Sequence, residues 1–416
     1  MSAETLGHTL PLWSVVPFVG LLLSIALLPL RAPRFWDKPR RQALVAALWS
    51  APVAAYFLWR APLELLRSAK DYASFIILLA ALFIVSGGIV LRGDLRATPL
   101  VNTGFLLAGA VLANVIGTTG ASMLLIRPLL QTNRERRRTR HIPVFFIFAV
   151  SNIGGCLTPL GDPPLFMGFL KGVPFFWTLR LFPAWALVLG GVLLVFFVLD
   201  SLEYGRETMK DLIRDRARVV PLHLKGRLNF AWVAGVVGGM FLPFPFREAA
   251  LVLMALLSLA TTRKSYRDEN RFGYAPIAEV AVLFAGIFVT MIPALLLVGA
   301  RGAALGVTRP WQFFWLTGGL SSFLDNTPTY LTFFSLARGL GLGGGVAGVP
   351  AVVLGAISAG AVFMGANSYI GNGPNFMVKR IAEHYRYAMP SFFGYMAYAA
   401  VVLGPLYIIA TLVFFR

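Results

Sequence analysis

Long apolar runs separated by short polar segments dominate the pattern along this chain. An α-helix rises 1.5 Å per residue, so a run of roughly 20 apolar residues crosses the ~30 Å hydrocarbon core of a bilayer. We expect ten such crossings, at residues 12–30, 42–59, 73–91, 141–170, 177–199, 230–243, 247–260, 276–298, 350–378 and 392–415. The pattern therefore predicts an all-α polytopic membrane protein whose main partner is the lipid bilayer.

Two further apolar stretches, residues 100–130 and 311–336, are interrupted near the middle by polar and turn-forming residues. The interruptions read ANVIGTTGAS at residues 113–122 and SSFLDNTPTY at residues 321–330. We interpret both stretches as re-entrant hairpins, which enter the membrane and return to the same side.

The basic residues support this topology. A hairpin does not change side whereas a spanning helix does, and cytoplasmic loops carry an excess of Lys and Arg. With both termini outside, 26 of the 37 basic residues fall in inner loops, including those of residues 134–140 and 201–227. Counting either hairpin as a single crossing would place basic loops such as 379–386 on the outer side.

The two halves of the chain share an order of parts: a long span, a hairpin, a broken span and a last span. We expect four regions: N-terminal scaffold helices (1–72), a first repeat (73–200), a basic linker with two scaffold helices (201–275), and a second repeat (276–416). The first repeat begins outside and the second inside, so the repeats are inverted. Inverted repeats with discontinuous helices are typical of secondary transporters, whose sites lie near the membrane midplane.

Each repeat also contains a broken span, 141–170 in the first and 350–378 in the second. The breaks read SNIGGCLTPLGDPP (151–164) and GANSYIGNGPN (365–375). Unpaired backbone groups are costly in hydrocarbon, so such breaks persist only where protein or a wet cavity satisfies them. All four interruptions carry side-chain oxygens and amides, a set that favours binding of a hard cation or a small solute.

Composition changes the picture at two points. The net charge is +19, which in a soluble protein would suggest nucleic acid. The excess instead reports membrane orientation and contact with anionic lipid, because 57% of the residues are hydrophobic and only 13% are charged. An enzyme is disfavoured, since HExxH and GxSxG are lacking and the single cysteine, Cys156, has no evident base.

The paired hairpins, SNIGG with GDPP, LDNTPTYL and ANSYIGNGPN resemble the ion transporter superfamily. The nearest resemblance is to sodium/proton antiporters of the NhaD type and to citrate-transporter-like proteins, and it covers nearly the whole chain from residue 73. It implies a homodimeric inner-membrane transporter whose hairpin-bearing units move against a scaffold. Its implied site-lining residues are Asn114, Ser151, Asn152, Asp325, Asn326, Thr327 and Asn367. The superfamily also includes dicarboxylate, citrate and arsenite carriers.

Two acidic residues, Asp162 and Asp325, lie in breaks of opposite repeats. An intramembrane carboxylate costs roughly 2.5 to 3.5 kcal/mol, so it points to function by default. We expect Asp325 to be the main ligand shared by Na⁺ and H⁺, and Asp162 the second ligand. The alternative for each is capping of the half-helix that follows, which for Asp162 begins at Pro163.

The remaining candidates are polar side chains at the same breaks. The full set that we expect to bind the ion or substrate, besides the two aspartates, is Asn114, Thr118, Thr119, Ser151, Asn152, Asn326, Thr327, Asn367, Ser368 and Asn372. The asparagines have a structural alternative, since each could bond a carbonyl freed at a kink. The four histidines, His141 among them, fall in termini or loops, where we expect solvated side chains.

The function that these observations favour is Na⁺ or Li⁺ exchange for H⁺ by an elevator-type movement, with no other cofactor. The alternative is cation-coupled or proton-coupled uptake of a carboxylate or other oxyanion, because half-helix N-termini at the breaks favour anions. Against this alternative, none of the four breaks contains Lys or Arg.

Overall fold

The computed structural model describes residues 3–416, which are mostly helical. Seven helical segments are long and apolar enough to cross a membrane: Leu12–Pro29, Pro39–Arg60, Pro62–Ser86, Pro99–Thr132, Phe175–Tyr204, Ala275–Leu305 and Phe392–Phe414. Shorter apolar helices cover His141–Leu157, Leu228–Gly239 and Ala351–Asn367. All ten expected crossings contain helix, but α11 (Leu228–Gly239) has 12 residues and reaches only about 18 Å. The number of complete crossings therefore stays a prediction.

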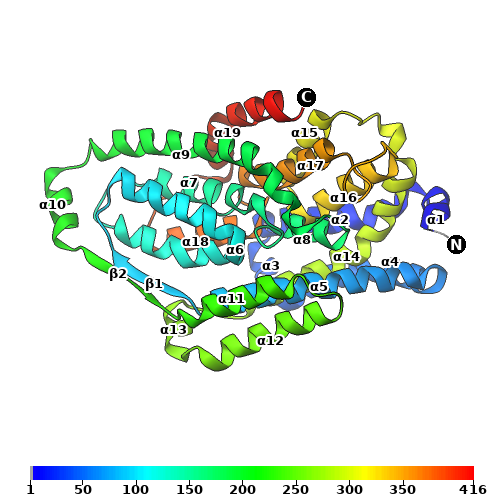
Figure 1. Ribbon diagram of the computed structural model, residues 1–416, viewed down its shortest axis with the longest axis horizontal. Coiled ribbons are helices and arrows are strands. Elements are labelled where there is room, and N and C mark those ends of the chain that lie inside the picture. Colours follow the sequence, from blue (N-terminus) through cyan, green and yellow to red (C-terminus); the bar gives the residue numbers. More distant parts are fainter. Residues whose placement is uncertain (1–2) are drawn as a thin grey trace.

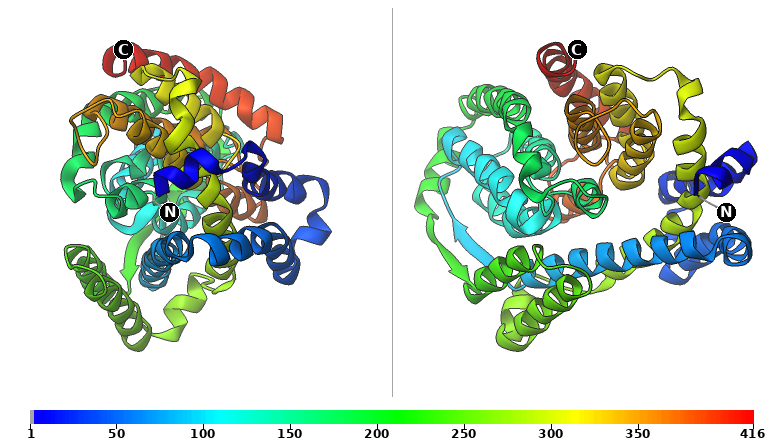
Figure 2. Two further views of the ribbon diagram at one scale, coloured as in Figure 1. Left: turned by 90° about the vertical axis from the view of Figure 1, so that its right-hand side faces the viewer. Right: turned by 45° about the vertical axis from the view of Figure 1, so that its right-hand side comes forward.

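One layer of the molecule, here called the scaffold, is built around two long helices that pack on each other, α5 (Pro62–Ser86) and α14 (Ala275–Arg301). Phe75 of α5 stacks on Phe284 of α14 with ring centroids 4.9 Å apart. Figure 2 shows this layer below the rest of the chain in its right-hand view. Its other elements are α1 (Ala3–Thr9), η1 (Leu12–Val15), α2 (Val16–Arg31), α3 (Pro33–Trp36), α4 (Pro39–Arg60), α11, α12 (Phe246–Thr261), α13 (Lys264–Glu269) and η4 (Gly302–Leu305).

The second layer, here called the hairpin bundle, contains both predicted hairpins and both broken spans (Figure 1). Its first half is α6 (Pro99–Thr132), α7 (His141–Ala149), η2 (Ile153–Leu157), α8 (Pro163–Leu170), η3 (Phe175–Leu181) and α9 (Phe182–Tyr204). Its second half is α15 (Pro310–Ser321), α16 (Asn326–Gly339), α17 (Ala351–Met364), η5 (Gly365–Asn367), α18 (Gly373–His384) and α19 (Phe392–Phe414). The two halves are packed together through α8 with α16 and α18 with α6.

The stretch α6 turns back on itself at Gly117, which lies inside the predicted interruption. Gly117 has φ of 76° and ψ of 156°, a conformation that favours glycine. The amide Nδ2 of Asn102 donates to Oδ1 of Asn133 at 2.9 Å, although these residues are 31 positions apart. A straight helix would separate them by about 46 Å. The open end of α6 and that of the α15–α16 pair lie at opposite ends of the molecule in Figure 1.

The basic linker is partly folded, which corrects the prediction of an all-α chain. Strand β2 (Val220–Lys225) pairs antiparallel with β1 (Val90–Asp94), with Val90 opposite Lys225 and Asp94 opposite Val220. A register shift lies between Arg92 and Asp94, at Gly93, where φ is 146°. Between α9 and β2 lies α10 (Met209–Ala217). The linker therefore packs on the loops of the hairpin bundle as well as facing outward.

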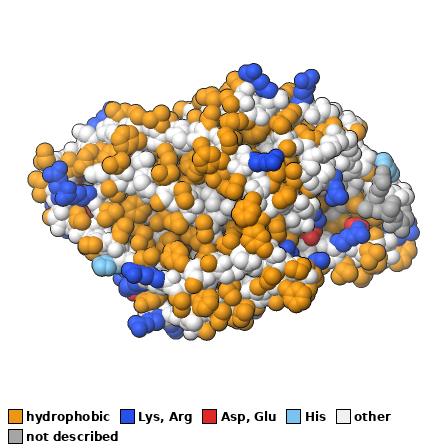
Figure 3. Space-filling model, viewed as in Figure 1, with side chains coloured by type: hydrophobic (Ala, Val, Ile, Leu, Met, Phe, Trp, Pro, Cys, Tyr) orange, Lys and Arg blue, Asp and Glu red, His pale blue; other side chains and the backbone are white. Residues whose placement is uncertain are grey.

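The surface fits an apolar surrounding. Hydrophobic side chains cover most of the face in Figure 3, and Lys and Arg side chains gather toward its margins. Many large apolar residues are exposed on helices long enough to span, such as Leu48 of α4 at 70% and Val401 of α19 at 74%. In water such a surface would be unfavourable, whereas in lipid it is the expected one.

Candidate functional site

All four interruptions meet at the carboxylate of Asp162, which is 1% exposed. Thr118 at the turn of α6 donates its hydroxyl to Oδ1 at 3.1 Å. The side-chain amide of Asn372, which precedes α18, donates to the same oxygen at 3.1 Å. The amide of Asn326, at the start of α16, donates to Oδ2 at 2.5 Å. These four residues are called the Asp162 centre below.

The local sequence explains why the Asp162 carboxylate is available for these partners. Asp162 is the N-cap residue of α8, but its side chain makes no capping hydrogen bond. Pro163 and Pro164 occupy the first two helical positions and have no N–H to donate, and the N–H of Leu165 donates to the backbone oxygen of Asp162. Both carboxylate oxygens therefore remain free to accept from other segments. The alternative in which Asp162 only caps α8 is wrong.

Asp325 has a different environment. Its Oδ1 accepts from the backbone N–H of Thr327 at 2.9 Å, which is the capping interaction of α16. Asp325 is half-buried. The structure thus gives Asp325 the capping role and places Asp162, the expected second ligand, at the centre. Thr327 is buried beside Asp325.

Matching side chains brace the two broken spans. The hydroxyl of Thr158 donates to the backbone oxygen of Asn114, and that of Ser368 donates to the backbone oxygen of Ser322, both at 2.5 Å. Asn114 Oδ1 also accepts from the N–H of Leu157 at 2.8 Å, and Asn367 Nδ2 donates to the Ser322 hydroxyl at 2.9 Å. Asn114 and Ser368 therefore satisfy a backbone N–H and a backbone carbonyl at the breaks, whereas Asn367 contacts a side-chain hydroxyl.

A second shell of buried polar groups links the broken spans to each other. Asn152 donates through Nδ2 to Oδ1 of Asn375 at 2.7 Å. Asn375 in turn donates to the backbone oxygens of Gly365 and Ser368, both at 2.9 Å. Ser151 accepts from Asn372 Nδ2 through its backbone oxygen at 3.2 Å. Its hydroxyl lies 2.8 Å from that of Ser122, a residue that the predicted set lacks although it stands in the same interruption.

Some buried oxygens near the Asp162 centre have no partner. Within residues 3–416, Oδ1 of Asn326 and Oδ1 of Asn152 accept no hydrogen bond. A buried acceptor without a donor is unfavourable unless a cation or a donor group reaches it. No group of three or more His, Cys, Asp and Glu side chains that could hold a metal occurs in the described chain. Any cation at this site would therefore take most of its ligands from amide, hydroxyl and backbone oxygens.

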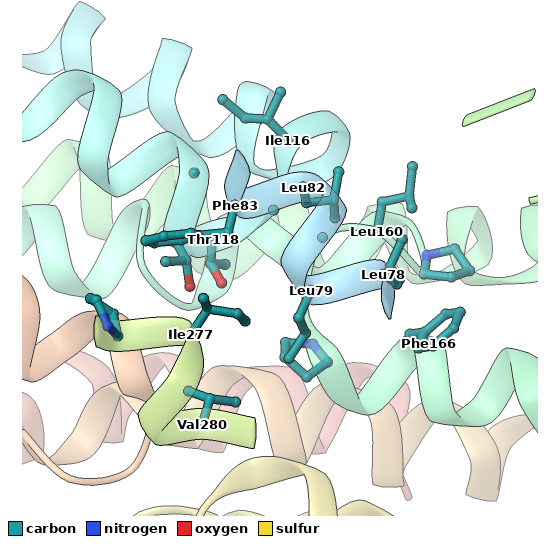
Figure 4. Close-up of a pocket in the computed structure, with 17 residues that line it drawn as sticks. Leu78, Leu79, Leu82, Phe83, Ile116, Thr118, Leu160, Phe166, Ile277 and Val280 are labelled. Carbon is teal, nitrogen blue, oxygen red and sulfur yellow. The ribbon is translucent and has the colours of Figure 1, made fainter. Parts of the chain in front are cut away.

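A cavity of about 90 Å³ lies beside the Asp162 centre, between the scaffold and the hairpin bundle. Thr118, Thr119, Gly161 and Pro163 form its bundle side. Figure 4 shows Ile116 and Thr118 on one side of it and Ile277 and Val280 of α14 on another. Of the predicted site residues, Thr119 lines this cavity and does not contact the Asp162 carboxylate. The cavity thus reaches Thr118 of the centre and both chain neighbours of Asp162 from the layer boundary.

The structure contradicts the expectation that His141 is solvated. His141 begins α7, is 4% exposed, and its Nε2 lies 2.9 Å from Oδ1 of Asp200 in α9. Arg136 and Asn102 also contact this carboxylate, at 2.7 and 2.8 Å. The cluster fastens the open end of the α6 hairpin to α7 and α9. The high apolar content around Asp200 was the one signal in the sequence that could have suggested a buried partner.

Residues 7–415 match the model of a family described as "Putative citrate transport". A comparison with curated proteins gives no match. The match spans almost the entire chain and includes both hairpins, both broken spans and the scaffold. Together with the apolar helices, it makes this chain a multi-pass membrane protein of a transport family. The chain belongs to the citrate transport family that this model describes.

Proposed function

We propose that this protein is a secondary transporter that moves a carboxylate such as citrate together with a cation or proton. The observation that carries the proposal is the buried Asp162 carboxylate, held only by neutral donors from three other interruptions. A polyanionic substrate brought beside an ionised Asp162 would leave like charges in a medium that screens them poorly. Binding therefore requires that Asp162 take a proton or that a cation enter with the substrate. The site couples the two by this electrostatic requirement.

The half-helix N-termini give the anion a place to bind. Three helical segments begin at the Asp162 centre: the second half of α6, α16 and α18. Their N-terminal N–H groups carry partial positive charge and favour carboxylate oxygens. Helix α8 contributes less, because two prolines fill its first turn. The unpaired oxygens of Asn326 and Asn152 are placed to receive the coupling cation.

The membrane arrangement that we propose follows the predicted topology. The α6 hairpin enters from the face with the basic linker, the α15–α16 hairpin enters from the opposite face, and their tips meet near the midplane. The basic linker faces the cytoplasm, the termini lie outside, and the inverted repeats exchange the site between faces by an elevator movement. The inner membrane and a homodimeric assembly follow from the resemblance to the ion transporter superfamily.

Uptake into proteoliposomes tests the proposal. Radiolabelled citrate and succinate are offered with an inward Na⁺ gradient, an inward proton gradient, or neither. We expect uptake that one gradient drives and that the matching ionophore abolishes. If neither citrate nor succinate is taken up under any gradient, carboxylate transport is refuted.

Exchange of Na⁺ for H⁺ is the second candidate. It is favoured by the finding that none of the side chains hydrogen-bonded to Asp162 in the described chain is basic. Everted vesicles with a pH-sensitive dye distinguish it: a response to Na⁺ without citrate supports exchange. A response to Na⁺ only when citrate is present supports the coupled carrier.

A further inference from the structure

A second cavity, of about 350 Å³, lies between α5 and α14 of the scaffold and α8 and α16 of the hairpin bundle. Its deep part is apolar, with Met167, Phe288 and Phe334 among its walls. Its rim carries three basic side chains, Arg67, Lys171 and Arg338, and two acidic ones, Glu64 and Asp71. Figure 3 shows basic and acidic side chains close together on the right-hand side of the molecule, where the ribbon view places α14.

The position of this cavity relates it to the Asp162 centre. Helix α8 begins directly after Asp162 and ends beside Lys171 at the cavity rim. Helix α16 begins with Asn326 of the centre, and Arg338 near its end also lies at the rim. Eight residues of α8 cover only about 12 Å. Between the two sites, α8 and α16 touch where Gly168 meets the Tyr330 hydroxyl, since a Cβ at Gly168 would clash with that oxygen. This contact therefore lies between the cavity and the Asp162 centre.

Among the basic side chains at the rim, Arg67 and Lys171 form ion pairs, and Arg338 has no partner within residues 3–416. Arg67 pairs with Glu64 at 2.6 Å, and Lys171 pairs with Asp71 at 2.5 Å. Arg338 forms no hydrogen bond or ion pair through its side chain with any other residue of the described chain, 3–416, and its side chain is exposed. The rim therefore has a net positive charge and one free guanidinium, which binds carboxylates through two parallel N–H groups.

We propose that this cavity is a carboxylate-binding vestibule in which Arg338, with Lys171 beside it, holds a di- or tricarboxylate before it passes the Gly168–Tyr330 contact. The proposal rests on the proposed function, because it assigns the same substrate class to a second site. Lys171 belongs to the bundle and its partner Asp71 to the scaffold. A substrate carboxylate replaces Asp71 at Lys171, and the vestibule then concentrates the anion at the mouth of the route.

Binding measured separately from transport tests the vestibule. Citrate binding to purified Asp162→Asn protein is measured by isothermal titration calorimetry. The substitution removes the charge of the Asp162 centre and leaves the cavity rim intact. We expect binding that weakens as salt concentration rises and that falls about tenfold or more when Arg338→Gln is added, since one charge-assisted contact is lost. Arg180→Gln is the matched control, because Arg180 is also an exposed arginine, located at η3 outside the cavity. It should leave binding unchanged.

The outcomes separate the two proposals. Citrate binding that depends on Arg338, in a wild-type protein that takes up no citrate, would refute the proposed function and support the vestibule. Citrate affinity that is the same with Arg338→Gln as without it would overturn the vestibule, whatever the transport result. In the transporting protein, Arg338→Gln should raise KM severalfold and leave kcat unchanged, because Arg338 acts before the rate-determining exchange. Size-exclusion elution of each variant as a single symmetrical peak checks its folding.

Discussion

The two intramembrane carboxylates look equivalent in the sequence and differ in the structure because of the residue that follows each of them. Asp162 precedes two prolines, which remove the N–H groups that a capping carboxylate would accept. Asp325 precedes Asn326 and Thr327, whose N–H groups are available, and it caps α16. The prolines therefore direct Asp162 toward the hairpin tips, and the caps of Asp325 hold one of these tips in place.

Substitution of the two aspartates should give opposite results. Asp162→Asn replaces one acceptor by an amide that faces the Nδ2 donor of Asn326, so one buried hydrogen bond is lost at a cost of about 1 to 3 kcal/mol. It also removes the only group of the centre that can take a proton. We expect coupled uptake to be abolished in proteoliposomes, with folding retained.

Asp325→Asn should keep most transport, since asparagine caps a helix about as well as aspartate. Asp325→Ala should lower the unfolding free energy by about 1 kcal/mol through loss of the cap. Thermal unfolding in detergent, alongside uptake, measures both effects. Loss of coupling in Asp325→Asn together with normal coupling in Asp162→Asn would restore the roles expected from the sequence.

The sequence could identify most members of the site but not their arrangement. Thr118, Asn326 and Asn372 are polar residues at interruptions of apolar runs, and the cost of such interruptions marks them. Which carboxylate they meet depends on contacts between residues 44 to 210 positions apart, and no local pattern encodes these. His141 and Asp200 were missed for the same reason, since each is buried by a partner 59 positions away.

At the scale of elements, the broken spans keep their shape by close backbone approach. A Cβ on Gly161 would lie 2.2 Å from the backbone oxygen of Gly155, and one on Gly371 would lie 2.6 Å from that of Gly365. Each half of the bundle therefore contains one such glycine–glycine contact. Glycine at these four positions lets the two backbone segments of each break lie in direct contact, with no side chain between them. These contacts hold Asp162 and Asn372 in position, because the two residues directly follow Gly161 and Gly371. The sequence predicted the breaks, but β1 and β2 could not be read from it, because the two strands have only five and six residues and contain Gly93 and Pro221, which are unfavourable in strands.

The linker helix α10 should bind the bundle more firmly at mildly acidic pH. Asp215 is buried, and its carboxylate accepts from the N–H of Ala97 at 3.1 and 3.2 Å. Burial raises the pKa of Asp215, and nearby Glu135 raises it further, against the lowering effects of the Ala97 N–H, Arg136 and Arg96. The docked form therefore holds the proton more tightly than the free linker does. Docking of α10 therefore becomes more favourable as the pH falls from above the raised pKa of Asp215 toward its ordinary pKa. It becomes less favourable as the pH rises again.

Hydrogen exchange of the Ala97 amide measures this effect once intrinsic exchange rates are corrected for pH. Protection should increase as the pH is lowered from neutral, and Asp215→Asn should weaken the dependence, because the amide keeps an acceptor and does not titrate. Asp94 contributes in the same direction, since burial also raises its pKa. Protection in the wild type that is constant across this range would show that docking does not involve these carboxylates.

At the scale of the whole molecule, the layer boundary determines whether the bundle can move. Scaffold and bundle contact each other mainly through α14 with α16, and also through α5 with α6 and α8. Glycines allow close approach at both places: a Cβ on Gly339 of α16 would clash with the backbone oxygen of Gly299 in α14, and one on Gly120 of α6 would meet the side chain of Ser86 in α5. Ion pairs that cross it include Lys171 with Asp71 and Arg380 of α18 with Asp37, at 2.5 and 4.0 Å. These helix contacts and ion pairs would have to change if the bundle moved against the scaffold.

A disulfide across the boundary should stop transport reversibly. A Cβ on Gly120 would lie 3.0 Å from the Cβ of Ser86, slightly closer than the ~3.8 Å typical of a disulfide, so a small shift permits the bond. The variant carries Ser86→Cys and Gly120→Cys with Cys156→Ala, which removes the buried native thiol. Oxidation should abolish citrate uptake, and a reductant should restore it, because the proposed elevator movement requires the bundle to move against α5.

The matched control places the same bond within the scaffold. A Cβ on Gly239 of α11 would lie 3.2 Å from that of Ala250 in α12, so Gly239→Cys with Ala250→Cys crosses no moving boundary. Its uptake should be the same oxidised and reduced. Full uptake by the oxidised Ser86–Gly120 variant, with the disulfide verified by mass spectrometry, would mean that the layers stay fixed. The substrate would then have to reach Asp162 by opening of the hairpin tips alone, without an elevator movement.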